Sequence, residues 1–104
     1  MSTKIIVICN LKPGKDPAAY EKWAREVDIP SATSLKSIDG FDLLRATGIF
    51  GSDEAPPYQY IEVLEVNSVE GLASEMAASE AMQQVAAQYQ EWTDNPIFIL
   101  TEPV

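Results

Sequence analysis

The hydrophobic residues of this chain follow two spacings in turn, one typical of strands and one typical of helices. Lys4–Leu11 is β-branched and apolar at successive positions, which predicts a strand covered on both faces. Turn residues occupy positions 12–15, and Asp16 and Pro17 then stand where a helix takes its N-cap and its first residue. A strand, a turn and a helix therefore open the chain.

The first helix places its apolar residues at positions i, i+3, i+4 and i+7, which are Tyr20, Trp23, Ala24 and Val27. Pro30 disfavours the helical conformation at Ile29, so we expect the helix to end or kink there. A short helical segment through Leu35 should follow, before Asp39 and Gly40 turn the chain.

Two β-type runs occupy the middle of the sequence. Residues 41–50 and 58–66 are rich in β-branched and aromatic residues, and a polar segment at 51–57 joins them. We expect an antiparallel pair with a long hairpin loop.

A second helical region follows. Asn67 and Glu70 resemble a capping box, and Ser79 could restart or kink the helix. Its apolar stripe comprises Val69, Leu72, Ala73, Met76, Met82, Val85, Ala86 and Tyr89. Residues 94–96 should stop the helix, and 97–100 form a last strand that is apolar on both faces.

The order of elements is β-α-β-β-α-β, which is typical of ferredoxin-like α+β folds in one domain over residues 1–104. Two helices should cover one face of a four-stranded antiparallel sheet. Because the first and last strands are apolar on both sides, we expect the other face to meet a second copy, so that a homodimer forms a barrel.

Composition and charge narrow the function. The 104 residues contain no histidine, which excludes a Ser-His-Asp triad, an HExxH zinc site and a His-ligated haem within the chain. The net charge is −9, and every Lys and Arg lies at or before Arg45. This charge disfavours nucleic acids and anionic membranes as partners. No signal peptide or membrane-spanning run is visible, and Cys9 is unpaired, so a cytoplasmic protein is expected.

Several segments together resemble the RedY-like (HapK-type) family of dimeric α+β barrel proteins. They are 10–12, 20–25, 28–30, 58–63, 82–86 and 94–99. The resemblance implies a homodimeric barrel with a pocket between helices and sheet in each protomer. It also implies a link to prodigiosin-type tripyrrole pigments or related aromatic natural products.

More distantly, the chain resembles the EthD and antibiotic-monooxygenase branches of the same superfamily. The EthD-like pattern has His-x-Pro after the first helix, whereas this chain has Asp28-Ile29-Pro30. A mechanism that depends on that histidine therefore does not carry over.

Three residues are candidates for catalysis. Asp28 is placed near a helix C-terminus, where the macrodipole should raise its proton affinity and suit it to general acid or base work; alternatively it only caps the next segment. Period two on the predicted strand puts Glu62 on a polar face, and Arg45 on the neighbouring strand is expected to pair with it. The alternative is a structural ion pair in the dimer interface.

Five residues are candidates for substrate binding: Asn10, Trp23, Tyr58, Tyr60 and Trp92. Asn10 either contacts a ligand or bonds to the backbone at a strand end. Trp23 sits on the helical stripe, where core packing is the alternative, and Trp92 is expected at a pocket mouth. Cys9 fits a small buried hydrophobe. No metal-binding or nucleotide-binding motif is present, so no metal and no cofactor are expected.

These features lead to three hypotheses. The first is a small-molecule-binding protein of secondary metabolism that assists a cofactor-free cyclisation, dehydration or other acid–base step on a hydrophobic aromatic ligand. The second is a cofactor-independent monooxygenase. The third is a non-catalytic binding or chaperone protein for a hydrophobic intermediate.

Overall fold

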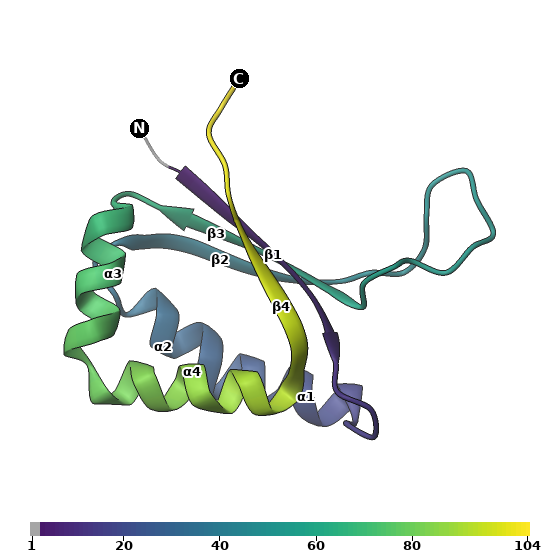
Figure 1. The fold of residues 1–104 in the computed structure, drawn as a ribbon, viewed down its shortest axis with the longest axis horizontal. Coiled ribbons are helices and arrows are strands. Elements are labelled where there is room, and N and C mark those ends of the chain that lie inside the picture. Colours follow the sequence, from purple (N-terminus) through teal and green to yellow (C-terminus); the bar gives the residue numbers. More distant parts are fainter. Residues whose placement is uncertain (1–2) are drawn as a thin grey trace.

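The computed structural model describes residues 3–104 and has the expected order of elements. The strands are β1 (Thr3–Leu11), β2 (Ile38–Arg45), β3 (Tyr60–Val66) and β4 (Thr93–Leu100), and the helices are α1 (Pro17–Trp23), the π-helical segment (Ala24–Asp28), α2 (Ile29–Thr33), α3 (Val69–Ala78) and α4 (Glu80–Trp92). The sheet has the order β2-β3-β1-β4 with antiparallel neighbours, and the helices cover one face of it (Figure 1). The predicted α+β, ferredoxin-like βαββαβ fold is confirmed.

The first helical region begins as predicted but does not end at Pro30. The Asp16 side chain accepts a hydrogen bond from the Ala18 amide, and Pro17 takes the first position of α1. Helical backbone then continues to Thr33, and the Ile29 amide bonds to the carbonyl of Ala24, five residues back. A proline in a regular α-helix clashes with the carbonyl four residues earlier, and a π-helical turn is one way to relieve such a clash.

The second helical region is two helices. Ser68 and not Asn67 caps α3, because its hydroxyl accepts from the Gly71 amide, so the expected cap was wrong by one residue. The predicted restart at Ser79 is confirmed, since its hydroxyl accepts from the Met82 amide and caps α4. Within residues 3–104, no helix combines the length and the apolarity needed to cross a membrane.

Four strand limits differ by two residues or more from the sequence-based expectation. β2 begins at Ile38 and not at residue 41, so the expected turn at Asp39 and Gly40 was wrong, because both residues lie within the strand. β2 ends at Arg45 and β3 begins at Tyr60, so the connecting arm, residues 46–59, is longer than predicted. One further ladder bond, from the Ala46 amide to the Gln59 carbonyl, marks its base. Beyond it Pro56 and Pro57 lack the N–H groups that a ladder needs, and β-bridging returns only between Ile49 and Ser52. At the other end of the chain, β4 begins at Thr93, directly after α4, and not at Ile97.

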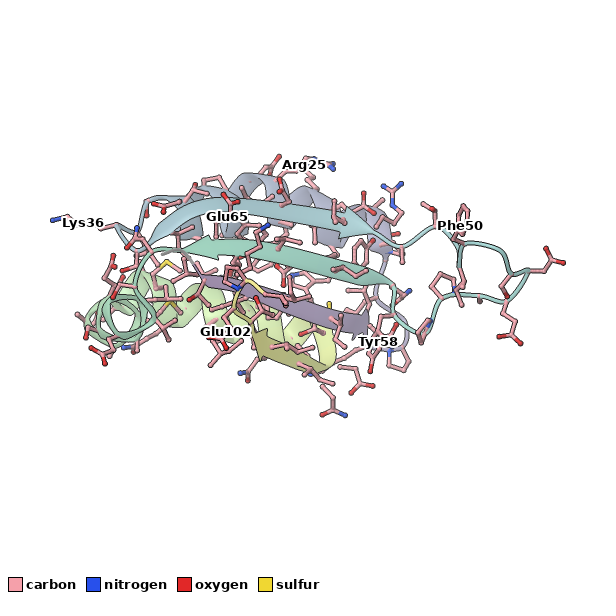
Figure 2. The ribbon with its side chains drawn as sticks, turned by 90° about the horizontal axis from the view of Figure 1, so that it is seen from above. Arg25, Lys36, Phe50, Tyr58, Glu65 and Glu102 are labelled. Atoms are coloured by element: carbon pink, nitrogen blue, oxygen red, sulfur yellow. The ribbon has the colours of Figure 1, made fainter. Side chains whose placement is uncertain are left out.

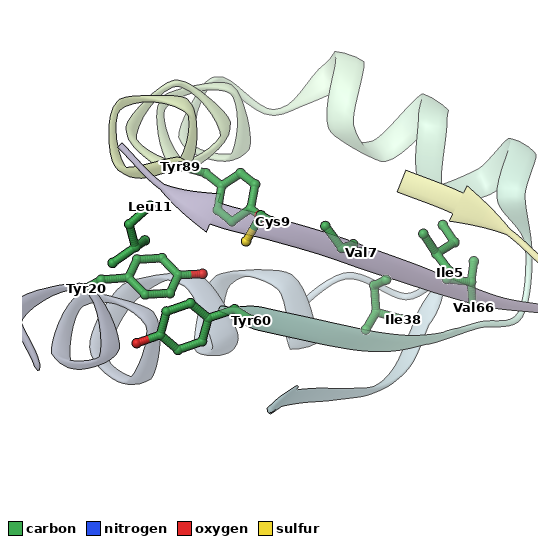
Figure 3. Close-up of a cluster of buried hydrophobic side chains, with 9 residues drawn as sticks. All are labelled: Ile5, Val7, Cys9, Leu11, Tyr20, Ile38, Tyr60, Val66 and Tyr89. Atoms are coloured by element: carbon green, nitrogen blue, oxygen red, sulfur yellow. The ribbon is translucent and has the colours of Figure 1, made fainter. Parts of the chain in front are cut away.

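The core lies between the sheet and the helices (Figure 3). Alternate residues of β1 point into it, and Val7 and Cys9 are fully buried. The predicted packing role of Cys9 is confirmed. Tyr20 of α1, Tyr60 of β3 and Tyr89 of α4 surround the Cys9 end of the strand. Three phenol rings from three elements therefore meet at one end of the core.

The opposite side of the sheet carries no helices, as the view onto it shows (Figure 2). The strand registers place seven apolar residues on this open face: Ile6, Ile8, Leu44, Ile61, Val63, Ile97 and Ile99. Ile97 and Ile99 on the edge strand β4 are 46% and 41% exposed. The predicted apolar character of both faces of the first and last strands is confirmed.

The cap of α4 gives a test of how this region is stabilised. Ser79→Ala should lower the free energy of unfolding by about 1 kcal/mol, because it removes the hydroxyl that accepts from the Met82 amide. Chemical denaturation checks this. Ser74→Ala is the matched control, since Ser74 is exposed within α3 and should tolerate alanine without loss. Equal stability of the two variants would contradict a role for the cap.

Candidate active site

A cavity of about 270 Å³ lies between the sheet and the helices and is partly open to solvent. Most of its lining is apolar, including Leu35, Phe41, Leu64, Met76, Met82 and Phe98. Among residues 3–104, only Asp28, Glu62, Tyr89 and Gln90 bring polar side-chain groups to it. The cavity therefore has the general character of a small-molecule site, an apolar space with a few convergent polar groups.

Glu62 reaches the cavity from β3, where the period of two turns its side chain toward the helices. It is 3% exposed, and the Tyr89 hydroxyl donates a hydrogen bond to its Oε2 at 2.8 Å. Burial raises the pKa of Glu62 to about 7; the nearby Asp28 carboxyl raises it further, and the Tyr89 hydrogen bond acts in the opposite direction. Glu62 therefore titrates close to neutral pH.

Asp28 reaches the same cavity from the end of the π-helical segment. It is 8% exposed, and no donor among residues 3–104 hydrogen-bonds to its carboxyl. Burial alone raises its pKa to about 6. The predicted rise in proton affinity is confirmed, but the expected cause was wrong, because Asp28 lies inside a continuous helical run and not at a helix C-terminus.

Two tyrosines and a thiol surround the two carboxyl groups. The Tyr20 hydroxyl is fully buried and has no hydrogen-bond partner in the described chain. Burial, followed by the charge of Glu62, raises the pKa of both Tyr20 and Tyr89, and burial also raises that of the Cys9 thiol. All three groups keep their protons at neutral pH, so the two carboxyls alone change charge in this range.

The geometry supports acid–base chemistry. Glu62 is held by Tyr89, whereas Asp28 is unpaired and faces the cavity. A group with a pKa near the working pH is both abundant in the correct protonation state and able to transfer its proton, which is the condition for general acid or base catalysis.

The predicted pairing of Arg45 with Glu62 is wrong. Arg45 lies opposite Tyr60 in the register, and its guanidinium forms a two-pronged ion pair with Glu21 of α1, with Nε to Oε2 at 2.9 Å. Leu43 and not Arg45 lies opposite Glu62. The long arginine side chain therefore reaches the nearest helix, and the Glu62 carboxyl stays without a basic neighbour.

Tyr60 belongs to this second cluster. Its hydroxyl donates to Glu21 Oε2 at 2.7 Å. Hydrogen bonds from Arg45 and then Tyr60 lower the pKa of Glu21 to about 2, and burial with the Glu21 hydrogen bond raises that of Tyr60 to about 12. These residues line a separate hollow of about 270 Å³ with Arg25, Ile29 and Leu43. The structure thus divides the predicted polar face of β3 between two sites.

The other candidates for substrate binding lie outside both cavities. Asn10 bonds to the backbone, as its Oδ1 accepts from the Gln59 amide at 3.0 Å and its Nδ2 donates to the Pro57 carbonyl, which is the strand-end alternative. Tyr58 precedes β3 at the end of the arm. Trp23 and Trp92 pack together with ring centroids 6.3 Å apart. Their indole rings extend the aromatic core around Tyr20.

Sequence reasoning overlooked the polar role of Tyr89. The sequence pattern placed it on the apolar stripe of the second helical region and gave it no polar role. A buried tyrosine normally needs a hydrogen-bond partner, so the need for an acceptor was visible in the sequence. Which acceptor it finds depends on how α4 packs over the sheet, and no local pattern encodes that packing.

The elements and the cavity define a ferredoxin-like α+β domain with a largely apolar cavity between helices and sheet. The model of one family, described as REDY-like protein HapK, matches residues 3–104. The chain therefore belongs to the HapK family of RedY-like proteins, and the predicted family is confirmed. No curated protein matches the sequence.

Solved structures share the fold at low sequence identity. HapK from Hahella chejuensis matches with a TM-score of 0.76 and 23% identity, covering 100% of this chain and 93% of that one. An EthD family protein from Bacillus halodurans matches at 0.72 and 14%, covering 100% of both chains. A dimeric ferredoxin-like protein from Jannaschia matches at 0.74 and 13%, covering 99% of this chain and 100% of that one.

The raised pKa of Glu62 predicts an unusual pH dependence of stability. The folded protein holds this proton more tightly than the unfolded chain, so wild type should lose stability as the pH rises from 4.5 to about 7. Glu62→Gln should lack this loss. Relative to wild type, it should gain roughly 3 kcal/mol of unfolding free energy over that range, because one pKa unit corresponds to about 1.4 kcal/mol.

Urea unfolding at several pH values between 4 and 8 measures this difference. Glu91→Gln is the matched control, because it makes the same substitution at an exposed position of α4 and should follow the wild-type curve. Parallel curves for wild type and Glu62→Gln would contradict the assignment of a buried, destabilised carboxylate.

Proposed function

We propose that this protein binds a small hydrophobic aromatic intermediate and assists an acid–base step on it, such as a cyclisation or a dehydration. The observation that carries the proposal is the pair of buried carboxyls, Asp28 and Glu62, at the wall of an otherwise apolar cavity. Family membership favours a substrate from the biosynthesis of tripyrrole-like or other aromatic natural products. The proposed step needs no cofactor.

The two carboxyls take different roles in this proposal. Asp28 has no hydrogen-bond partner among residues 3–104, so its carboxylate is free to accept a proton from a ligand or to return it. Glu62 is fixed by Tyr89 and orients the polar end of the ligand. Because their pKa values lie at about 6 and about 7, one group is mostly ionised at neutral pH and the other partly protonated.

The proposal can be tested with a probe reaction that needs only a base in an apolar site. A carboxylate removes the ring C3 proton of 5-nitrobenzisoxazole while the N–O bond breaks, and the product is a coloured cyanophenolate. Wild type should accelerate this reaction over buffer, with a rate that rises through about pH 6 as Asp28 ionises. Asp28→Asn should lower kcat/KM by about 100-fold, which is typical of losing a general base.

Glu91→Gln should keep the full rate, since its side chain is exposed on α4 and is not among the residues that line the cavity. Protein that binds the probe without accelerating the reaction would contradict catalysis and favour a binding or chaperone protein. An equal rate for wild type and Asp28→Asn would remove Asp28 from the mechanism.

We also propose that the working form is a homodimer that pairs the open faces of two protomers. The seven apolar residues of this face support the pairing. The Jannaschia neighbour, which is described as dimeric, provides a precedent. Two sheets stacked in this way bury the surface that a single protomer leaves in water. The helices cover the other face of the sheet (Figure 1), so they stay on the outside of the pair.

Sedimentation velocity at micromolar concentration should therefore show twice the subunit mass. Ile97→Lys should weaken the dimer by at least about tenfold, because it buries a charge in an apolar interface. Gln88→Lys places the same charge on the helical side, where Gln88 is exposed, and should leave the dimer intact. A stable single subunit in wild type would contradict the pairing.

A further inference from the structure

The charges around the cavity are all of one sign. Asp28 and Glu62 face it, and no Lys or Arg is among its lining residues. Arg25 and Arg45 belong to the separate hollow, where both pair with Glu21. The buried carboxylates therefore lack a counterion from the protein itself, and an isolated buried charge is unfavourable unless something pairs with it.

Asp28 shows where such a partner would bind. The residue is 8% exposed, its side chain forms part of the cavity wall, and its carboxyl receives no hydrogen bond from residues 3–104. Glu62 uses Oε2 to accept from Tyr89, and no donor is assigned to its Oε1. Two carboxyl groups that can each accept further hydrogen bonds thus border one cavity. An N–H group of a ligand could donate to the carboxyl oxygens that receive no hydrogen bond from the protein.

The rest of the cavity suits a flat apolar body. Phe41 and Phe98 line it from β2 and β4, and Met76 and Met82 line it from α3 and α4. Aromatic faces and polarisable methionine sulfurs favour contact with aromatic rings and also tolerate a nearby positive charge. The volume of about 270 Å³ accommodates a fused bicyclic ring with a short polar chain.

We propose that this cavity selects an organic cation, namely a protonated amine, amidine or iminium group carried on a flat apolar body. The inference rests on the proposed function only in that both require the cavity to hold a ligand. An anionic ligand would meet two carboxylates without a counterion, and a neutral one would leave both charges uncompensated. A cationic N–H group supplies the hydrogen bonds and the charge together.

The pH dependence of this selectivity follows from every titratable group that faces the carboxyls. Tyr20 from α1, Tyr89 from α4 and Cys9 from β1 all keep their protons at neutral pH. Only Asp28 and Glu62 change charge between pH 5 and 8. Because an alkylamine stays protonated over that range, its binding should strengthen as the pH rises.

The test uses three probes of equal shape and different charge: 2-(2-naphthyl)ethylamine, 2-(2-naphthyl)ethanol and 2-naphthylacetate. Calorimetric titration of the full-length protein at pH 8 should show the amine binding at least about tenfold more tightly than the alcohol, because hydrogen bonds to charged groups are the stronger kind. The acetate should bind most weakly. At pH 5 the preference for the amine should shrink.

Two variants assign the selectivity to the cavity. Glu62→Gln keeps an acceptor for Tyr89 but removes the charge, so it should lower amine affinity several-fold more than alcohol affinity. Gln90→Lys places a positive charge at the exposed rim of the same cavity and should weaken the amine while strengthening the acetate. Failure of both shifts would overturn the inference.

The results separate this inference from the proposed function. Equal affinity for the amine and the alcohol would overturn the selection of a cation, while binding itself and base catalysis with the nitrobenzisoxazole probe could still stand. Tight amine binding without base catalysis would support the selectivity and contradict only the catalytic step. Absence of binding for all three probes would overturn both.

Discussion

The burial of the Glu62 carboxyl on a central strand is the constraint on which the rest of the site depends. Glu62 lies on β3, which is paired on both sides, with β1 and with β2. Because successive strand residues face opposite sides of the sheet, its side chain could reach the other side only if the whole strand shifted its register. The carboxyl must therefore find a donor in the core, and Tyr89 supplies it. Asp28 then shares the same apolar space, and its carboxyl further disfavours the charged form of Glu62.

This arrangement lowers the stability of the folded protein when the two carboxyls are charged. An apolar residue at position 62 would pack without any charge penalty, so nothing in the fold requires a glutamate there. A strained or destabilised group that the fold does not need is typical of a functional site. The ferredoxin-like scaffold alone does not specify a reaction, since relatives of this fold differ widely in sequence. Any reaction would have to be specified by the residues at the cavity wall.

The sequence predicted the parts of this structure that depend on local pattern. Strand periodicity placed Tyr60, Glu62 and Leu64 on one face, and Asp16 and Ser79 marked two helix starts. The partner of Arg45 was predicted wrongly because a long side chain can reach residues on other elements as well as on the neighbouring strand. Arg45 pairs with Glu21 of α1, whereas Glu62 lies two positions along β3 from Tyr60, the residue opposite Arg45. The π-helical turn was missed because the periodic pattern assumes a constant 3.6 residues per turn.

The order of the four strands has a consequence for how the chain assembles. The arm at residues 46–59 divides the polypeptide into halves, with β1 and β2 before it and β3 and β4 after it. In the sheet order β2-β3-β1-β4, every hydrogen-bonded neighbour comes from the opposite half. Neither half contains a single strand-to-strand ladder of its own. Strands from the two halves alternate across the sheet, so the sheet forms only when both halves are present. A chain cut within the arm would therefore regain its fold solely by complementation between the two fragments.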